Sequence, residues 1–289
     1  MKLRIFSIFS LLLSLSTPAF ALEQVGTISN SLGGAGRAAA DPTEAIFLNP
    51  AAIGFLQSRL FSSAHYSRAE NDDRNTNQYG FVFADGSLDK IVPGSLAYTE
   101  TDFSFDDDSR GKSREFRAAI GGTPHPQLSF GLGGHYSIYN SRENRRFYQS
   151  NLNLGFLFVP FDWLGLALTG ENLLKVNSDV DAWARDVRSY GFGFHFLYEE
   201  LFRLRFDVVR PVTLNPQSRT NFHAGIENIF AQWFAMRLGF RWDEVRSQHF
   251  ATGGLGYRGP RLSADYAFSQ GVHGRKDETR HLIDLWITF

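Results

Sequence analysis

Cysteine is absent from the 289 residues of the chain. Disulfides, thiolate metal sites, a cysteine nucleophile and a lipidated N-terminal cysteine are therefore excluded. No apolar run reaches about 18 residues, the length a membrane helix needs, and the mean hydropathy is -0.22, so a helical membrane bundle is excluded. With 29 Lys and Arg against 30 Asp and Glu there is no basic excess, and we expect no nucleic-acid partner. What is abundant is Phe, at 28 residues, and Gly, at 27, unlike a Leu- and Ala-rich soluble core.

The N-terminus predicts export. Lys2 and Arg4 precede an apolar stretch over residues 5–15, and residues 19–21 read Ala-Phe-Ala, with small residues at both positions that a signal peptidase reads. This three-part pattern is typical of a secretory signal peptide, which we expect to be residues 1–21. The alternative, an N-terminal membrane anchor, would need an apolar run about twice as long.

After this region the chain alternates between apolar and polar residues in successive short segments. The clearest segment places Phe234, Met236, Leu238, Phe240 and Trp242 at every second position. Because successive side chains of a strand point to opposite faces, each such segment is a predicted strand with one apolar face. Fourteen segments follow one another: residues 57–68, 76–84, 93–102, 113–122, 127–140, 147–159, 162–171, 187–198, 201–210, 218–229, 232–242, 246–257, 260–269 and 279–289.

Two folds share this pattern: a soluble β-sandwich with its apolar face inside, and an outer-membrane barrel with its apolar face toward lipid. The connections favour the barrel, because short ones such as residues 160–161 and 230–231 alternate with longer ones such as residues 172–186. Residues 85–92 are the one exception. We therefore predict an all-β fold, a transmembrane antiparallel β-barrel of fourteen strands over residues 55–289. Closure is required physically, because an open sheet edge in lipid leaves backbone groups unpaired.

The chain ends on an aromatic residue, Phe289, that continues the apolar face of Ile283, Leu285 and Ile287. A terminal aromatic on an alternating last strand looks like the signal that the barrel assembly machinery of bacteria reads. An ordinary edge strand is the alternative, which the signal peptide, the even strand count and the alternating connections disfavour. We expect a bacterial outer-membrane location, with outer-membrane lipid and, through Phe289, the barrel assembly machinery as partners.

Residues 22–54 do not alternate and are rich in small residues. Asp41 and Pro42 predict a helix start, with Asp41 as the cap and Pro42 in the first turn. Asn49 and Pro50 predict the end of the same helix. We expect a compact segment of one or two helical turns before the first strand.

The same segment carries a resemblance to a known family. Residues 33–37 (GGAGR), an acidic spacer and residues 49–52 (NPAA) ahead of the first strand resemble the start of the long-chain fatty-acid transporter (FadL-like) family. The superfamily also includes PorV-like accessory proteins of a secretion system, and its members are fourteen-stranded barrels with an N-terminal plug folded inside. The resemblance, which covers about twenty residues, implies that residues 22–54 are a luminal plug. Its plug residues would be Gly33, Gly34, Gly36, Arg37, Asp41, Asn49 and Pro50.

Two functions follow from the resemblance. The first is passive transport of small hydrophobic, fatty-acid-like molecules (or a detergent) past the plug. The second is a non-transporting, PorV-like barrel that docks surface or secreted proteins. Transporters of the family usually carry large external loops, whereas the longest external connection here, residues 172–186, is fifteen residues and largely polar. This departure disfavours high-affinity capture of fatty acids.

The polar face of the predicted strands should line the lumen, because charges facing lipid near the bilayer midplane are costly. A paired network that solvates the wall and holds the plug is the first interpretation; an electropositive permeation path of four arginines is the second. The predicted lumen-lining residues are Arg203, Arg205, Asp207, His223, Glu227, Arg237, Arg241 and Asp265, and the same parity adds Glu115, Arg117, His195 and Asp284.

Nothing in the sequence indicates catalysis. His223 with Glu227, or His135 with a nearby Ser, are the pairs that could serve a barrel hydrolase, but no nucleophile motif accompanies them. The eight His residues lack metal-ligand spacing, and residues 106–108 (DDD) lack the spacing of a calcium loop. We expect no enzymatic activity, no cofactor and no metal.

Overall fold

The computed structural model describes residues 26–56, 60–71, 74–86, 92–105, 109–141, 145–174, 180, 185–199, 201–212, 219–274 and 278–289. The predicted signal peptide and the Asp106 to Asp108 run lie outside the described residues. No helix in the described part is long and apolar enough to cross a membrane.

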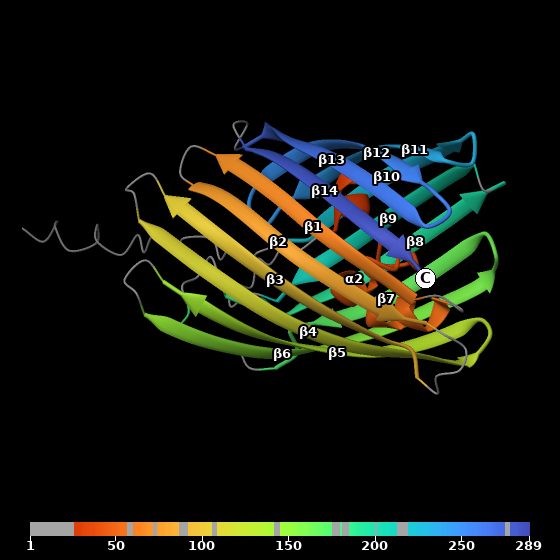
Figure 1. Cartoon of the computed structure of the whole chain (residues 1–289), viewed down its shortest axis with the longest axis horizontal. Helices are drawn as coiled ribbons and strands as arrows, with labels where there is room; N and C mark the ends of the chain where they lie inside the picture. Colours follow the sequence, from red (N-terminus) through yellow and green to blue (C-terminus); the bar gives the residue numbers. More distant parts are fainter. Residues whose placement is uncertain are drawn as a thin grey trace, which may run out of the picture.

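Fourteen antiparallel strands of the described part form one closed barrel (Figure 1). Each strand pairs with its neighbours in sequence, and β1 closes on β14 from Phe61 opposite Thr288 to Glu70 opposite Thr279. The predicted fourteen-stranded barrel is confirmed, and every predicted strand overlaps an observed one. The strands are β1 (Leu60–Asn71), β2 (Arg74–Asp85), β3 (Gly94–Phe105), β4 (Arg110–His125), β5 (Leu128–Asn140), β6 (Arg146–Phe161), β7 (Leu164–Glu171), β8 (Ser189–Tyr198), β9 (Phe202–Pro211), β10 (Asn221–Phe230), β11 (Phe234–Asp243), β12 (Gln248–Arg258), β13 (Leu262–His273) and β14 (Thr279–Thr288).

The apolar face of each strand is the outer face. On β11, Met236 and Leu238 are 48% and 54% exposed, whereas Ala235 and Arg237 between them are 1% exposed. A buried arginine beside exposed Leu and Met inverts the arrangement of a soluble domain. The barrel therefore presents a hydrocarbon-compatible surface outward and encloses its charges.

The wall of the barrel is uneven in height. Strands β4 and β6 have 16 residues each, whereas β7 has 8. Pairing between β6 and β7 begins at Leu154, so the first half of β6 rises above β7. The β1–β2 connection is shorter than expected, with only two residues between Asn71 and Arg74. Strand β1 ends and β2 begins in polar residues, so hydrophobic alternation did not predict these ends of the two strands.

Three short helices precede β1 and lie inside the barrel (Figure 1). They are α1 (Thr27–Ser31), α2 (Ala45–Leu48) and the 3-10 helix η1 (Pro50–Phe55). Helix α1 packs against β11 to β14, and η1 packs against β3 to β6. We call residues 26–56 the inserted segment. Nearly all of its residues are buried, which makes it part of the interior of the barrel.

Glycines in the wall make room for the inserted segment. A Cβ added at Gly239 would lie 2.3 Å from the carbonyl carbon of Leu32, and one at Gly131 would lie 2.1 Å from that of Pro50. Both distances are far below van der Waals contact. Any larger residue at these two positions would push the inserted segment away from the wall.

The predicted helix start at Asp41 is wrong. Helix α2 begins at Ala45, and its N-cap is Glu44. The carbonyl oxygen of Asp41 accepts from the amides of Glu44 and Ala45 in the preceding turn, at 3.1 and 2.9 Å. The Asp41 carboxylate instead pairs with Arg205 of the wall. The predicted end is confirmed, since α2 ends at Leu48 with Asn49 as its C-cap, and Pro50 then begins η1.

Candidate functional site

The inserted segment is fixed to β9 by a carboxylate. Oδ2 of Asp207 accepts hydrogen bonds from the backbone amides of Gly36 and Arg37, at 2.9 and 3.0 Å. The Arg37 guanidinium completes the contact, with Nη1 3.3 Å from Asp207 and Nη2 2.9 Å from Glu171 at the end of β7. Arg37, predicted as a plug residue, and Asp207, predicted as a lumen-lining residue, thus contact each other. Glu171 was not predicted, although its parity on β7 places it on the inner face.

A second ion pair joins the inserted segment to β9. Arg205 pairs with Asp41, and both side chains are nearly enclosed. Burial pushes the pKa of Asp41 upward, but the charge and hydrogen bonds of Arg205 outweigh it and hold the pKa well below its usual range. Asp41 is therefore a charged anchor that Arg205 orients.

Asn49 holds the inserted segment in its turn before η1. Its side-chain amide donates to the carbonyl of Arg37 at 2.8 Å, and its oxygen accepts from the amide of Ala51 at 3.0 Å. The amide also reaches the carbonyl of Phe156 on β6 at 3.4 Å. An Asn side chain can both donate and accept in this way, so it closes the turn where a small apolar residue could not. Pro50 follows it and seats against Gly131.

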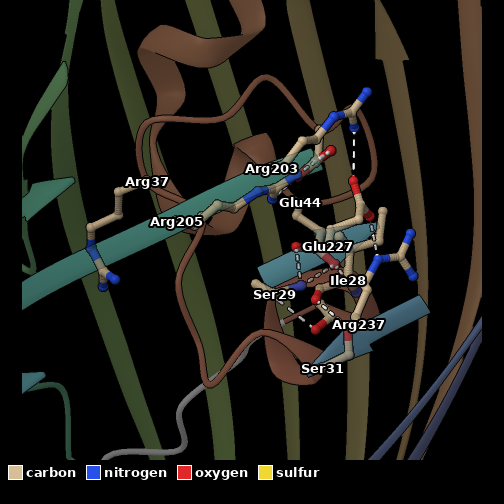
Figure 2. A network of polar contacts seen from close by, with 12 residues as sticks. Ile28, Ser29, Ser31, Arg37, Glu44, Arg203, Arg205, Glu227 and Arg237 are labelled. Carbon is tan, nitrogen blue, oxygen red and sulfur yellow. Dashed lines mark hydrogen bonds and ion pairs between the residues drawn. The ribbon is translucent and has the colours of Figure 1, made fainter. Parts of the chain in front are cut away.

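Glu44 organises helix α1. Its carboxylate accepts from the amide of Ile28 at 2.6 Å and from the amide of Ser29 at 2.9 Å (Figure 2). These amides belong to the first turn of α1, where backbone donors otherwise lack partners. Burial, reinforced by the charge of Asp41, raises the pKa of Glu44 to about 7. Glu44 could not be recognised from the sequence, because the helix whose amides it accepts begins about sixteen residues earlier in the chain.

The turn after α1 fits against β10 and β12. Gly33 and Gly34 have φ angles of +71° and +93°, a region that favours glycine. His223 Nδ1 lies 2.8 Å from the carbonyl oxygen of Gly33, and the Gly33 amide donates to the Thr252 hydroxyl at 2.9 Å. The Thr252 hydroxyl in turn donates to the carbonyl of Ser31 at 3.0 Å. The two predicted glycines and His223 thus form one contact surface.

Charged side chains of the wall form a cross-strand network beside the inserted segment. Glu227 on β10 lies opposite Arg203 on β9 and opposite Arg237 on β11. Its carboxylate takes an ion pair from each of these arginines, and Figure 2 shows both pointing toward it. Arg237 also reaches Asp265 at 2.6 Å, across the glycine-rich β12. Trp286 then donates to the other oxygen of Asp265 at 3.0 Å.

The four predicted lumen arginines therefore do not line a bare electropositive path. Arg203, Arg205 and Arg237 all contact carboxylates, and the Arg241 guanidinium lies 4.1 Å from the centre of the Phe250 ring. This arrangement favours the first interpretation, a paired interior network. Recognising these pairs requires the register of neighbouring strands. Residue spacing alone therefore could not distinguish the paired network from the electropositive path.

The β7–β8 connection bends into the barrel. On β6, the inward amides of Asn153 and Asn151 accept from the backbone amides of Asn172 and Leu174, both at 2.9 Å. The carboxylate of Asp186 lies 2.9 Å from His135 Nε2 on β5 and accepts from Asn151 at 2.9 Å. Burial raises the pKa of Asp186, but His135 and the Asn151 hydrogen bond outweigh it and lower the pKa below its ordinary value. The described part of this connection thus covers the interior rather than projecting outward.

The residues considered for catalysis are engaged elsewhere. Glu227 bonds arginines and His223 bonds the inserted segment, while His135 bonds Asp186. In the described ranges, no group of three or more His, Cys, Asp and Glu side chains could hold a metal ion. The remaining parity-predicted residues lie inside as well: Glu115 pairs with Arg117, and His195 is partly buried.

Comparison with known proteins finds solved structures of similar fold but no relative in sequence. No family model matches the chain, and no curated protein sequence matches it. Among solved structures, the CymD monoaromatic hydrocarbon channel is similar, with a TM-score of 0.69 at 12% identity over 93% of this chain and 98% of that one. The toluene transporter TodX of Pseudomonas putida has a TM-score of 0.67 at 12% identity over 94% and 99%. A FadL homologue of Pseudomonas aeruginosa has a TM-score of 0.66 at 11% identity over 94% and 99%. The resemblance to FadL-like barrels is confirmed at the level of the fold.

Proposed function

We propose that the chain is an outer-membrane channel for small hydrophobic molecules, with the inserted segment as its plug. The observation that carries the proposal is the combination of an apolar outer face with a polar interior occupied by residues 26–56. Three solved structures of the same fold are described as a monoaromatic hydrocarbon channel, a toluene transporter and a FadL homologue. Export by the predicted signal peptide and recognition of Phe289 by the barrel assembly machinery belong to the same proposal.

The plug role rests on the way the inserted segment is attached. Asp207, Arg205 and Glu171 hold it from the wall, while Gly131 and Gly239 receive its backbone. These attachments, and the hydrogen bonds of Gly33 and Ser31 with Thr252, are separate from the hydrogen bonds between strands, so the segment can shift without opening the wall. A hydrophobic molecule would then pass beside a displaced segment.

Equilibrium binding tests the transport function. Purified protein in detergent would be titrated with a radiolabelled long-chain fatty acid and, separately, with radiolabelled toluene. Saturable binding of either, displaced by its unlabelled form, is the expected result. A matched sample of the protein unfolded in urea controls for partition into the detergent micelle. Binding that stays linear with concentration for both probes would refute the hydrophobic-ligand function.

The alternative function, a barrel that docks surface or secreted proteins, is favoured by one observation. The β7–β8 connection is bonded to β5 and β6 from the inside, so its described part forms no external groove for ligand capture. Purification in mild detergent from the native membrane would decide. A stoichiometric protein partner with no hydrocarbon binding would support docking over transport.

A further inference from the structure

The outer face of β4 changes in character along the strand. It is cationic at the end that meets the β3–β4 connection, then aromatic, then aliphatic. This is the order of a lipid leaflet, from the headgroups through the interface to the hydrocarbon. From that connection onward, the outward residues are Arg110, Lys112, Arg114, Phe116, Ala118 and Ile120.

Strand β6 repeats this order two strands away. Arg146 is exposed at its start, and Tyr148 follows on the outer face at 49% exposure. The register places Lys112 opposite Asn140 of β5, and Asn140 opposite Arg146. Because neighbouring strands are about 5 Å apart, the backbones of Lys112 and Arg146 are about 10 Å apart. We call the outward cations of β4 and β6 the cationic patch: Arg110, Lys112, Arg114 and Arg146.

The cationic patch carries more positive charge than its neighbours on β3 neutralise. Glu100 pairs with Lys112 and with Arg114, each at 2.8 Å. Asp102 also pairs with Lys112, at 3.1 Å. Two cations of the patch form no ion pair with any described residue, and both are exposed: Arg110 and Arg146.

The cationic patch lies at one end of the barrel only. The other halves of β4, β5 and β6, which are residues 118–125, 128–134 and 152–161, contain no Lys, Arg, Asp or Glu. The patch lies beside the connections after β3 and β5, at the end away from Phe289 (Figure 1). Longer connections mark the external end in barrels of this kind, so the outer leaflet surrounds this end.

We propose that the cationic patch binds the phosphate groups of a glycolipid in the outer leaflet of the membrane. A guanidinium group holds a phosphate through two parallel hydrogen bonds, and a lysine adds a point charge. Next to the patch, the apolar outer face continues with Phe116 at 50% and Leu152 at 40% exposure, which acyl chains of the same molecule would cover. A free phosphate or a soluble protein would leave that apolar surface unused. The inference rests on the outer-membrane location in the proposed function.

Native mass spectrometry of the full chain in detergent tests the cationic patch. The probes are lipid A with two phosphates and the one-phosphate form prepared from it, which keeps the same acyl chains. Wild type should reach half-occupancy with the two-phosphate lipid at a several-fold lower concentration than with the one-phosphate lipid. Equal binding of the two lipids would overturn the proposal. Displacement of the two-phosphate lipid by an equal concentration of inorganic phosphate would also overturn it, because the site would then take a free anion.

A double variant and a control locate the binding. Arg110→Gln combined with Arg146→Gln removes the two exposed, unpaired cations, so half-occupancy should need several-fold more of the two-phosphate lipid. Arg68→Gln, an exposed arginine on β1 outside the patch, should bind lipid A as wild type does. Equal lipid A binding by wild type and the double variant would refute the patch. The transport function is tested separately: lipid A binding without binding of toluene or fatty acid would refute transport alone, and the reverse would refute the patch alone.

Discussion

At the scale of single residues, the interior depends on charges that are satisfied by their neighbours on adjacent strands. Arg237 has no exposed side-chain surface and bridges Glu227 and Asp265, which are equally enclosed. Such a bridge adds little net stability compared with an apolar interior, because desolvation offsets the attraction. Removing one partner of the bridge is costly, since the remaining charges stay buried without their counter-ion.

Replacing Arg237 with Met should therefore destabilise the barrel by about 3–5 kcal/mol, the cost of breaking a buried pair. Urea unfolding in phospholipid vesicles measures it. Arg68→Ala is the matched control, because Arg68 and its partner Glu70 are 54% and 44% exposed. An exposed pair contributes about 0–1 kcal/mol. Equal losses in the two variants would contradict the network.

The second residue-scale prediction concerns pH. The pKa of Glu44 rises from an ordinary 4.5 to about 7 in the folded chain. Because the folded pKa is the higher one, the stabilising contribution of this group is complete below pH 4.5 and is lost as the pH rises toward 7. Glu44→Gln should therefore flatten the fall in unfolding midpoint between pH 4.5 and 7 relative to wild type. Identical pH profiles of the two proteins would show that Glu44 does not titrate in this range.

At the scale of elements, the strands were predictable and the inserted segment was not. Alternation located all fourteen strands, because lipid outside and a polar interior impose a period of two along every one of them. Strand ends were less certain where polar residues continue the pairing, as from Arg68 to Asn71 on β1. Helices α1, α2 and η1 have four to six residues each, too short for a periodic pattern.

The conformation of the inserted segment is set by distant contacts. Asp41 resembles a helix cap in sequence, yet Arg205, 164 residues away, engages its carboxylate. Glu44 supplies the cap of α1 without any local signal. The candidate lumen residues could be assigned to a face by parity, but their partners depend on register. For that reason the spacing of Arg203 and Arg237 left their common partner, Glu227, unidentified.

The anchoring of the inserted segment leads to the element-scale prediction. Asp207→Asn removes the ion pair with Arg37 and weakens acceptance from the amides of Gly36 and Arg37. Conductance in planar bilayers should then show more frequent or larger openings than in wild type. Deletion of residues 22–54 should raise conductance further, and Glu70→Gln on the outer face of β1 should leave it unchanged. Wild-type conductance in both Asp207→Asn and the deletion would mean that the inserted segment does not limit passage.

At the scale of the whole molecule, the apolar outer face of the barrel should meet lipid. Leu238 lies in the middle of β11 with 54% of its surface exposed, and Phe234 lies at the end of the same strand with 46% exposed. Leu238→Arg should cost about 2–4 kcal/mol near the bilayer midplane, and Phe234→Arg about 0–1 kcal/mol near the interface. Reversible unfolding in vesicles measures both. Equal effects at the two depths would contradict a membrane-embedded wall.

Uptake by reconstituted vesicles measures directly whether hydrophobic molecules pass this barrel beside its inserted segment. Vesicles containing the protein would be supplied with radiolabelled fatty acid or toluene in the presence of an internal trap. We expect faster initial uptake than in protein-free vesicles, accelerated again by Asp207→Asn and unchanged by Glu70→Gln. Uptake at the protein-free rate for both molecules, in every variant, would contradict this expectation.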